Sequence, residues 1–232
     1  MVKSIKEETF KANLDLVKYG LVTLTWGNVS AIDRSEGLVV IKPSGVDYAQ
    51  MKAEDMVVVD MQGRLVEGKL KPSSDLPTHL ELYKNFPDIG GVAHTHSEFA
   101  CMFAQACKEI PCYGTTHADH FNGPVPLTRF LKEDEVNTGY ELNTGVVIIE
   151  RFMNLNALET PGVLVAGHGP FTWGKSAADA VNNSLVLEKI AKMAWGVRQL
   201  NDEAKPLPDY ILKKHYERKH GKHAYYGQKN RG

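Results

Sequence analysis

The stretch Gly90-Gly91-Val92-Ala93-His94-Thr95-His96 joins a short apolar run to two histidines that lie two residues apart. In a β-strand, residues i and i+2 share a face and lie about 6.5 Å apart along the chain, so both rings can reach one ion. Imidazole suits zinc, copper, nickel or iron far better than magnesium. The stretch therefore predicts a transition-metal site at a strand end, with a hydrogen-bonded polar pair as the alternative.

The composition is that of an ordinary globular protein, with 232 residues, 43% hydrophobic and 24% charged. A net charge of −1 gives no basic field that would attract nucleic acid or an anionic membrane surface. No apolar run approaches the roughly 18 residues of a membrane span, and the first residues lead into a charged amphipathic segment. Three cysteines without C-x-x-C spacing are consistent with reduced thiols. We therefore expect a cytoplasmic protein with no nucleic-acid or membrane partner.

Four β-rich runs lie close together early in the chain, over residues 21–26, 38–41, 56–60 and 64–67. Turn residues separate them, including 33–37 between the first two runs. Connections this short favour antiparallel pairing over crossover helices. The pattern predicts a hairpin whose first strand covers residues 21–26.

Apolar spacing and capping signals predict helices around these strands. The expected helices cover residues 4–20 (capped by Ser4), 75–86, 98–107, 144–154, 177–200 and 209–220, with a strand as the alternative for 144–154 because of its Val-Val-Ile-Ile core. Residues 91–96 and 162–166 are expected to be strands, and 114–120 are typical of a loop. No internal repeat appears, so we expect one domain over residues 1–232. The predicted fold is α/β, a three-layer α/β/α sandwich around a mostly antiparallel or mixed sheet.

A catalytic zinc commonly has three protein ligands and an open position, so His94 and His96 need a distant partner. His168 is the best candidate, because it follows a predicted buried strand and lies between two glycines. An ordinary turn residue is the alternative there. Asp75 lies at a loop-to-helix junction, where it could be a fourth ligand, an orienting partner of a histidine, or a helix cap.

Three turns could bind an anion: Trp26-Gly27-Asn28, Lys42-Pro43-Ser44-Gly45 and Lys71-Pro72-Ser73-Ser74. Glycine lets backbone N–H groups approach an oxyanion, and hydroxyl, amide and ammonium groups add donors. Each turn alone is also typical of an ordinary turn that ends a strand and binds no ligand. Together, near a predicted metal, they favour a phosphate group in the ligand.

Two further segments carry groups that could transfer protons, residues 115–119 with Asp119 and the tail with Tyr225 and Tyr226. A carboxylate and a phenol near a metal could act as base and acid if neighbours move their pKa values toward neutrality. The sequence does not show that these segments meet. Most of the remaining histidines are interpreted as solvated or capping residues.

Several long motifs occur in a fixed order along nearly the whole chain. They are residues 21–30 (LVTLTWGNVS), 41–46 (IKPSGV), 71–75 (KPSSD), 94–97 (HTHS), 114–119 (GTTHAD), 167–171 (GHGPF), 219–221 (KHG) and 224–228 (AYYGQ). In these motifs the chain resembles the class II sugar-phosphate aldolase/epimerase family. The resemblance implies an α/β/α sandwich that assembles as a homotetramer, with active sites between neighbouring subunits.

Carried over position by position, the resemblance implies zinc ligands at His94, His96 and His168, with Asp75 at the carboxylate position next to the metal. It implies phosphate-binding turns at Gly27, Asn28, Ser44, Gly45, Ser73 and Ser74. Aldolase relatives typically carry glutamate at the position of Asp75, so aspartate there favours an epimerase.

The catalytic pair implied by the resemblance is Asp119 and Tyr226, with the tyrosine reaching in from the adjacent subunit and His215 as a further helper. The implied reaction interconverts L-ribulose 5-phosphate and D-xylulose 5-phosphate by retro-aldol cleavage and re-formation of the C3–C4 bond. One zinc ion per subunit is implied, with manganese or cobalt as substitutes. The alternatives are an aldolase that releases its aldehyde and, in another class, a non-catalytic zinc-binding assembly protein.

Overall fold

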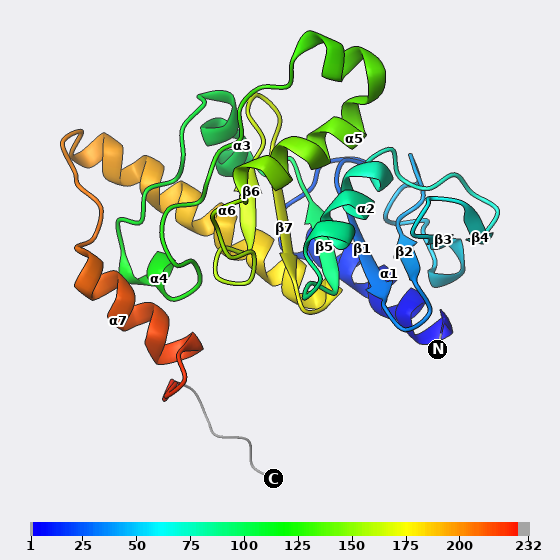
Figure 1. The fold of residues 1–232 in the computed structure, drawn as a ribbon, viewed down its shortest axis with the longest axis horizontal. Coiled ribbons are helices and arrows are strands. Elements are labelled where there is room, and N and C mark those ends of the chain that lie inside the picture. Colours follow the sequence, from blue (N-terminus) through cyan, green and yellow to red (C-terminus); the bar gives the residue numbers. More distant parts are fainter. Residues whose placement is uncertain (1, 227–232) are drawn as a thin grey trace.

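The strands of this protein form one seven-stranded antiparallel sheet over the described residues, in the order β4-β3-β2-β1-β5-β7-β6 (Figure 1). The computed structural model describes residues 2–226. Its strands are β1 (Asn28–Asp33), β2 (Leu38–Ile41), β3 (Val57–Asp60), β4 (Leu65–Glu67), β5 (Gly91–His94), β6 (Gly162–Leu164) and β7 (Pro170–Gly174). Its helices are α1 (Val2–Lys18), the 3-10 turn η1 (Ala53–Asp55), α2 (Leu76–Asn85), α3 (Glu98–Gln105), α4 (Thr115–Ala118), α5 (Glu133–Arg151), α6 (Ala177–Leu200) and α7 (Asp209–His220).

Helices cover both faces of the sheet, so the predicted three-layer α/β/α sandwich is confirmed (Figure 1). Successive side chains of a strand point to opposite faces. Val39 and Val57 therefore pack under α2 and α5, whereas Val40 and Val58 pack against α1. On this second face, Ala180 of α6 joins the cluster around β1, β5 and α1.

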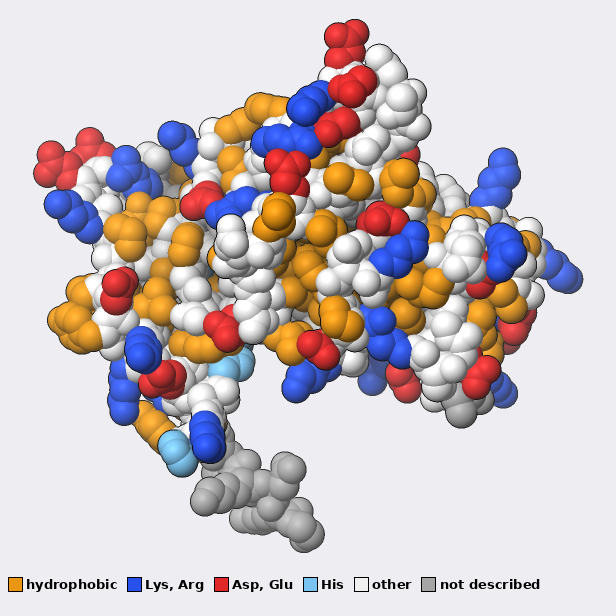
Figure 2. Space-filling view, viewed as in Figure 1, with side chains coloured by type: hydrophobic (Ala, Val, Ile, Leu, Met, Phe, Trp, Pro, Cys, Tyr) orange, Lys and Arg blue, Asp and Glu red, His pale blue; other side chains and the backbone are white. Residues whose placement is uncertain are grey.

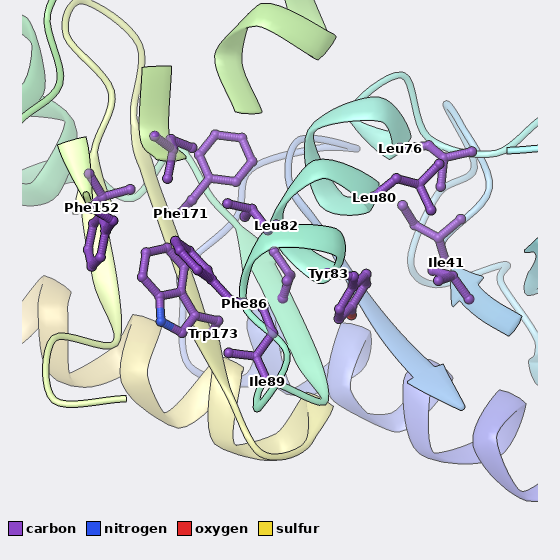
Figure 3. Close-up of a cluster of buried hydrophobic side chains, with 14 of the residues drawn as sticks. Ile41, Leu76, Leu80, Leu82, Tyr83, Phe86, Ile89, Phe152, Phe171 and Trp173 are labelled. Carbon is purple, nitrogen blue, oxygen red and sulfur yellow. The ribbon is translucent and has the colours of Figure 1, made fainter. Parts of the chain in front are cut away.

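An aromatic cluster fills the space between α2, α5 and the sheet (Figure 3). The ring centroid of Trp173, on β7, lies 5.1 Å from that of Phe86 and 5.0 Å from that of Phe152. The indole nitrogen of Trp173 donates a hydrogen bond of 2.7 Å to the Ala157 carbonyl, so its polar atom is satisfied in the core. The cluster fixes the ends of α2 and α5 on β7.

The glycine pair of the opening stretch lets α6 begin close to β5. A Cβ atom at Gly91 would collide with the backbone of Ser176 and Ala177. Ser176 caps α6 by accepting a hydrogen bond from the Asp179 amide. The predictions for α6 and α7 are confirmed at both ends.

The predicted strand over residues 21–26 is wrong. Leu24 has a left-handed φ of 54°, and the Trp26 amide donates to the Thr23 carbonyl in a tight turn. Leu24 is 77% exposed and Trp26 is 51% exposed, so the apolar run does not have one buried face. The hairpin with β2 exists, but its first strand begins at Asn28.

Three other expectations also differ from the structure. The helix expected over 144–154 begins much earlier, at Glu133, because residues 133–138 form a first helical segment before a break at Gly139. Ser4 lies inside α1 and is not its cap. Strand β7 was not predicted, and residues 114–120 contain the single helical turn α4.

None of the helices within residues 2–226 has the length and apolar composition needed to cross a membrane.

We expect Gly91→Ala to lower the free energy of unfolding by about 3 kcal/mol, the upper end of usual overpacking costs, because the atoms in the way are backbone. Urea unfolding at constant m-value measures this change. Gly196→Ala is the matched control: no atom lies within 4 Å of its added Cβ, and alanine is favoured in a helix by up to about 1 kcal/mol. Equal midpoints for the two variants would contradict the role given to Gly91.

Candidate metal centre and active site

Three histidines from separate parts of the chain converge at one end of the sheet. His94 is the last residue of β5, His96 follows in the loop before α3, and His168 lies in the loop between β6 and β7. One nitrogen from each ring lies within 4.8 Å of the others. The structure therefore places His168 next to the His-x-His pair, as predicted.

The rings are oriented by their surroundings. The Nδ1 atom of His94 donates to the Pro170 carbonyl at 2.9 Å, and the Phe171 ring stacks on the imidazole with centroids 4.1 Å apart. This hydrogen bond leaves Nε2 of His94 free, and that atom lies 3.0 Å from Nε2 of His96. Carbonyl partners of this kind fix the tautomer of metal-binding histidines.

The three rings are suited to a metal ion such as zinc. Burial is the largest cause that lowers the pKa of His168, to about 4, and the neighbouring His94 and His96 lower it further. Burial and His94 also lower the pKa of His96. Neutral rings offer lone pairs, and the Nε2 atoms of His94 and His96, 3.0 Å apart, are close enough for both to bind one ion.

Asp75 lies beside the histidines but outside the group of converging donor atoms. It occupies the N-cap position of α2, but its side chain makes no capping hydrogen bond. Its carboxylate instead accepts a hydrogen bond of 2.6 Å from the Asn28 side-chain amide. Burial alone would raise the pKa of Asp75, but the nearby His94 and His79 and the Asn28 hydrogen bond outweigh it and hold that pKa below its ordinary value. The helix-cap interpretation of this side chain is therefore wrong.

The contact between Asp75 and Asn28 is the first rung of a polar ladder between β1 and α2. The next rungs join Ser30 to Nδ1 of His79 at 2.7 Å and to the Tyr83 hydroxyl at 2.8 Å. Two residues of a strand rise about 6.6 Å and four residues of a helix about 6 Å. The step from Asn28 to Ser30 on β1 therefore matches the step from Asp75 to His79 on α2. The i, i+4 and i+8 spacing of Asp75, His79 and Tyr83 along α2 is the signal in the sequence that points to His79 and Tyr83.

The three predicted anion-binding turns lie around a single cavity of about 520 Å³ that also contains the three histidines and Asp75. The turn residues that line it include Gly27, Asn28, Ser44, Gly45, Ser73 and Ser74.

Backbone hydrogen bonds hold two of these turns side by side. The Ser44 amide donates to the Lys71 carbonyl at 3.0 Å, and the Ser73 amide donates to the Lys42 carbonyl at 2.9 Å. The ammonium of Lys42 donates to the Val46 carbonyl at 2.9 Å, and burial lowers the pKa of this lysine. The cavity thus joins donor-rich turns to a nitrogen-rich metal site.

Asp119 and Tyr226 do not line this cavity in the same chain. Asp119 follows α4, and its carboxylate accepts from Arg218 at 2.6 and 3.0 Å and from Nδ1 of His215 at 3.1 Å. The Tyr226 ring lies 4.9 Å from the Arg218 guanidinium carbon and is 60% exposed. The structure brings these predicted residues together around Arg218, away from the histidines. The motif residues Gly227 and Gln228 lie outside the described residues.

His168 has a further contact that the sequence does not predict. The Tyr140 hydroxyl lies 3.2 Å from Nδ1 of this histidine. Tyr140 belongs to the part of α5 that was assigned to no element, and it lies 28 residues before its partner. No local signal in the sequence pointed to this contact.

We expect His96→Asn to remove most of the divalent metal that the purified protein retains, because only two converging imidazoles remain. Elemental analysis of purified protein measures the stoichiometry. His223→Asn, in the exposed tail, is the control that removes an imidazole elsewhere. Full metal content in a folded His96→Asn variant would contradict the assignment.

Comparison with known proteins agrees with this geometry. Residues 7–195 match the family described as class II aldolase and adducin N-terminal domain. The chain is 59% identical over 228 residues to the L-ribulose-5-phosphate 4-epimerase UlaF of Salmonella paratyphi C, covering 98% of this chain and 100% of the relative. The Salmonella typhi protein of the same name is 58% identical over the same shares. A solved structure of an L-fuculose 1-phosphate aldolase has a TM-score of 0.79 and 27% identity, covering 93% of this chain and 95% of that one. The chain belongs to the class II aldolase family.

Proposed function

We propose that this chain, acting as one domain over residues 1–232, is a zinc-dependent epimerase that interconverts L-ribulose 5-phosphate and D-xylulose 5-phosphate. The observation that carries the proposal is the single cavity in which three converging histidines face donor-rich turns. Its ligand must combine a group that binds a metal with a group that accepts several hydrogen bonds, as a phosphorylated ketose does. Relatives that are 58–59% identical to this chain, and that are covered along their full length, are named for this activity.

The turns bind the phosphate end of the substrate in this proposal. Gly27, Asn28, Ser44, Gly45, Ser73 and Ser74 line the cavity, and their hydroxyl, amide and backbone N–H groups are the donors that a phosphate accepts from. Gly45 has a left-handed φ of 68°, a conformation that glycine adopts without strain and that turns the backbone of this segment. A phosphate held by several donors stays in place while the other end of the molecule moves.

His94, His96 and His168 hold one zinc ion per subunit, with Asp75 beside them. Zinc supplies Lewis-acid stabilisation of the negative charge that develops on substrate oxygens. Manganese or cobalt would also be accepted, because imidazole and carboxylate ligands suit them.

The reaction must avoid removing the C4 proton directly, because C4 is not adjacent to the carbonyl carbon and its proton is not acidic. Loss of the C4 hydroxyl proton instead allows the C3–C4 bond to break, which gives the enediolate of dihydroxyacetone and glycolaldehyde phosphate. Rotation of the aldehyde presents its opposite face, and re-formation of the bond with return of the proton gives the epimer. Asp119 and Tyr226 exchange this proton on opposite faces, with His215 as a neighbour of Asp119.

A homotetramer with shared active sites would supply the proton-transferring residues that the cavity lacks within one chain. Large apolar side chains are exposed at the end of the molecule that carries α6 and α7, including Leu200 at 90% and Trp195 at 46% (Figure 2). Such surfaces favour contacts between subunits. We also propose a cytoplasmic location, where the three free cysteines would stay reduced.

A coupled assay on the zinc-loaded protein tests the function. We expect L-ribulose 5-phosphate to be converted to D-xylulose 5-phosphate, without accumulation of free glycolaldehyde phosphate. Stoichiometric release of the aldehyde would favour the aldolase alternative. No turnover at any metal loading would favour the non-catalytic alternative.

We expect Tyr226→Phe to bind zinc normally but to turn over about 10²–10⁴-fold more slowly, the usual cost of losing a general acid or base. Steady-state rates with metal analysis measure both. Unchanged turnover would remove Tyr226 from the mechanism.

Mixing inactive Asp119→Asn and Tyr226→Phe variants tests whether different subunits contribute the two groups. We expect partial recovery of activity, because some sites then combine an intact Asp119 with an intact Tyr226. No recovery despite demonstrated subunit exchange would mean that one chain supplies both groups, as their common contact with Arg218 would allow.

A further inference from the structure

Residues 128–140, which lead into α5 and include its first part, contact the loop that carries His168. The Thr128 hydroxyl accepts a hydrogen bond of 3.1 Å from the Ala166 amide. The Phe130 ring fills the space beside Gly167, where a Cβ atom would lie 2.7 Å from a ring carbon. The Tyr140 hydroxyl then reaches Nδ1 of His168 itself. Three consecutive residues of the loop are thus contacted by one segment.

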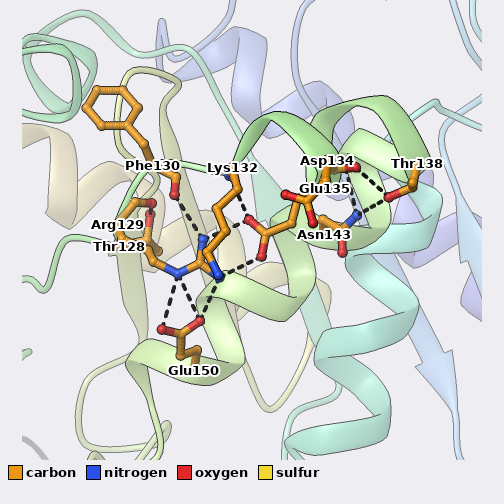
Figure 4. A network of polar contacts seen from close by, with 9 residues as sticks. All are labelled: Thr128, Arg129, Phe130, Lys132, Asp134, Glu135, Thr138, Asn143 and Glu150. Atoms are coloured by element: carbon orange, nitrogen blue, oxygen red, sulfur yellow. Dashed lines mark hydrogen bonds and ion pairs between the residues drawn. The ribbon is translucent and has the colours of Figure 1, made fainter.

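Tyr140 follows directly after the point at which α5 is interrupted. Gly139 has non-helical backbone angles, so residues 133–138 and 140–151 form two helical segments with different directions. Asn143, in the second segment, donates a hydrogen bond of 2.7 Å to the backbone carbonyl of Glu135 in the first segment (Figure 4). The position of the Tyr140 side chain therefore depends on how the two segments are held together.

One guanidinium joins the two segments across this break. Arg129 donates two hydrogen bonds of 2.7 Å to the Glu135 carboxylate, which lies before Gly139 (Figure 4). It also donates to Glu150, after Gly139, at 3.0 and 3.2 Å. The bonds from Arg129 lower the pKa of Glu135 to about 2, so this carboxylate stays charged near neutral pH. The fork geometry of arginine suits such a bridge, whereas lysine offers a single point charge.

We propose that Tyr140 is a positioning residue for His168, and that the clamp of Arg129, Glu135 and Glu150 holds Tyr140 in place. The tyrosine oxygen accepts from Nδ1–H of His168, which leaves Nε2 as the free nitrogen of that ring. The Pro170 carbonyl acts on His94 in the same way. The inference rests on the metal site of the proposed function and not on the reaction.

Tyr140→Phe removes the hydroxyl and keeps the ring. Loss of a partner that orients a metal-binding histidine typically weakens metal affinity about 10–100-fold, and we expect a loss in that range. Competition with a chromophoric chelator for Co²⁺ or Zn²⁺ measures it. Tyr210→Phe, whose side chain is 76% exposed on α7, is the matched control and should bind metal like the unaltered protein. Equal affinities in all three proteins would overturn the role of Tyr140.

A measurement on the metal-free protein tests the same contact independently. The ¹⁵N shifts of the His168 ring should report the Nδ1–H tautomer in the unaltered protein and a larger Nε2–H population in Tyr140→Phe. An unchanged tautomer would overturn the proposed hydrogen bond.

The clamp is tested by Glu135→Gln, alone and combined with Tyr140→Phe. If the clamp acts through Tyr140, Glu135→Gln weakens metal binding alone but adds nothing in the Tyr140→Phe background. Additive losses would overturn the clamp. Failure of the unaltered protein to bind metal would instead contradict the proposed function, so the two failures are distinguishable.

Discussion

The antiparallel pairing of β1 with β5 places Asn28 directly opposite His94, and the active end of the molecule depends on this register. Shifting one strand by a single residue would turn each side chain to the other face of the sheet. In the observed register, Asn28 and Ser30 face α2, where Asp75 and His79 meet them one helical turn apart. The matched rise of β1 and α2 thus places a row of polar contacts next to the end of β5 that carries His94.

Two buried polar atoms on this ladder have no hydrogen-bond partner among the described residues: Oδ1 of Asn28 and Nε2 of His79. An unpaired buried donor or acceptor costs about 1–3 kcal/mol. The Asn28 side chain contacts Asp75, and the His79 side chain contacts Ser30. The protein concentrates this cost beside the candidate metal centre, while the core next to it is packed with aromatic side chains whose polar atoms are satisfied.

The candidate metal ligands and the proposed proton-transferring groups lie in two separate places of one chain. The histidines and the anion-binding turns lie at one end of the rigid sheet, which suits groups that must keep fixed positions. Asp119, Arg218 and Tyr226 lie at α4 and α7, and α7 projects from the body of the molecule (Figure 1). Residues carried by a projecting helix can reach a cavity of another subunit, and this favours assembly as part of the proposed mechanism.

The features that depend on near neighbours could be predicted from the amino-acid sequence. The cap at Ser176, the apolar period of α6, the basic helix α7 and the two-residue spacing of the first histidine pair are all set within one or two turns of chain. Spacing and turn chemistry also pointed to His168 and to the three anion-binding turns, and the resemblance to a known family added the pairing of Asp119 with Tyr226. The start of β1, the presence of β7 and the extension of α5 back to Glu133 became visible in the folded structure. Only it joined Tyr140 to His168 and bridged the broken helix through Arg129. Apolar period and capping act over a few residues, whereas these features depend on packing and hydrogen bonds between segments that meet only when the chain is folded.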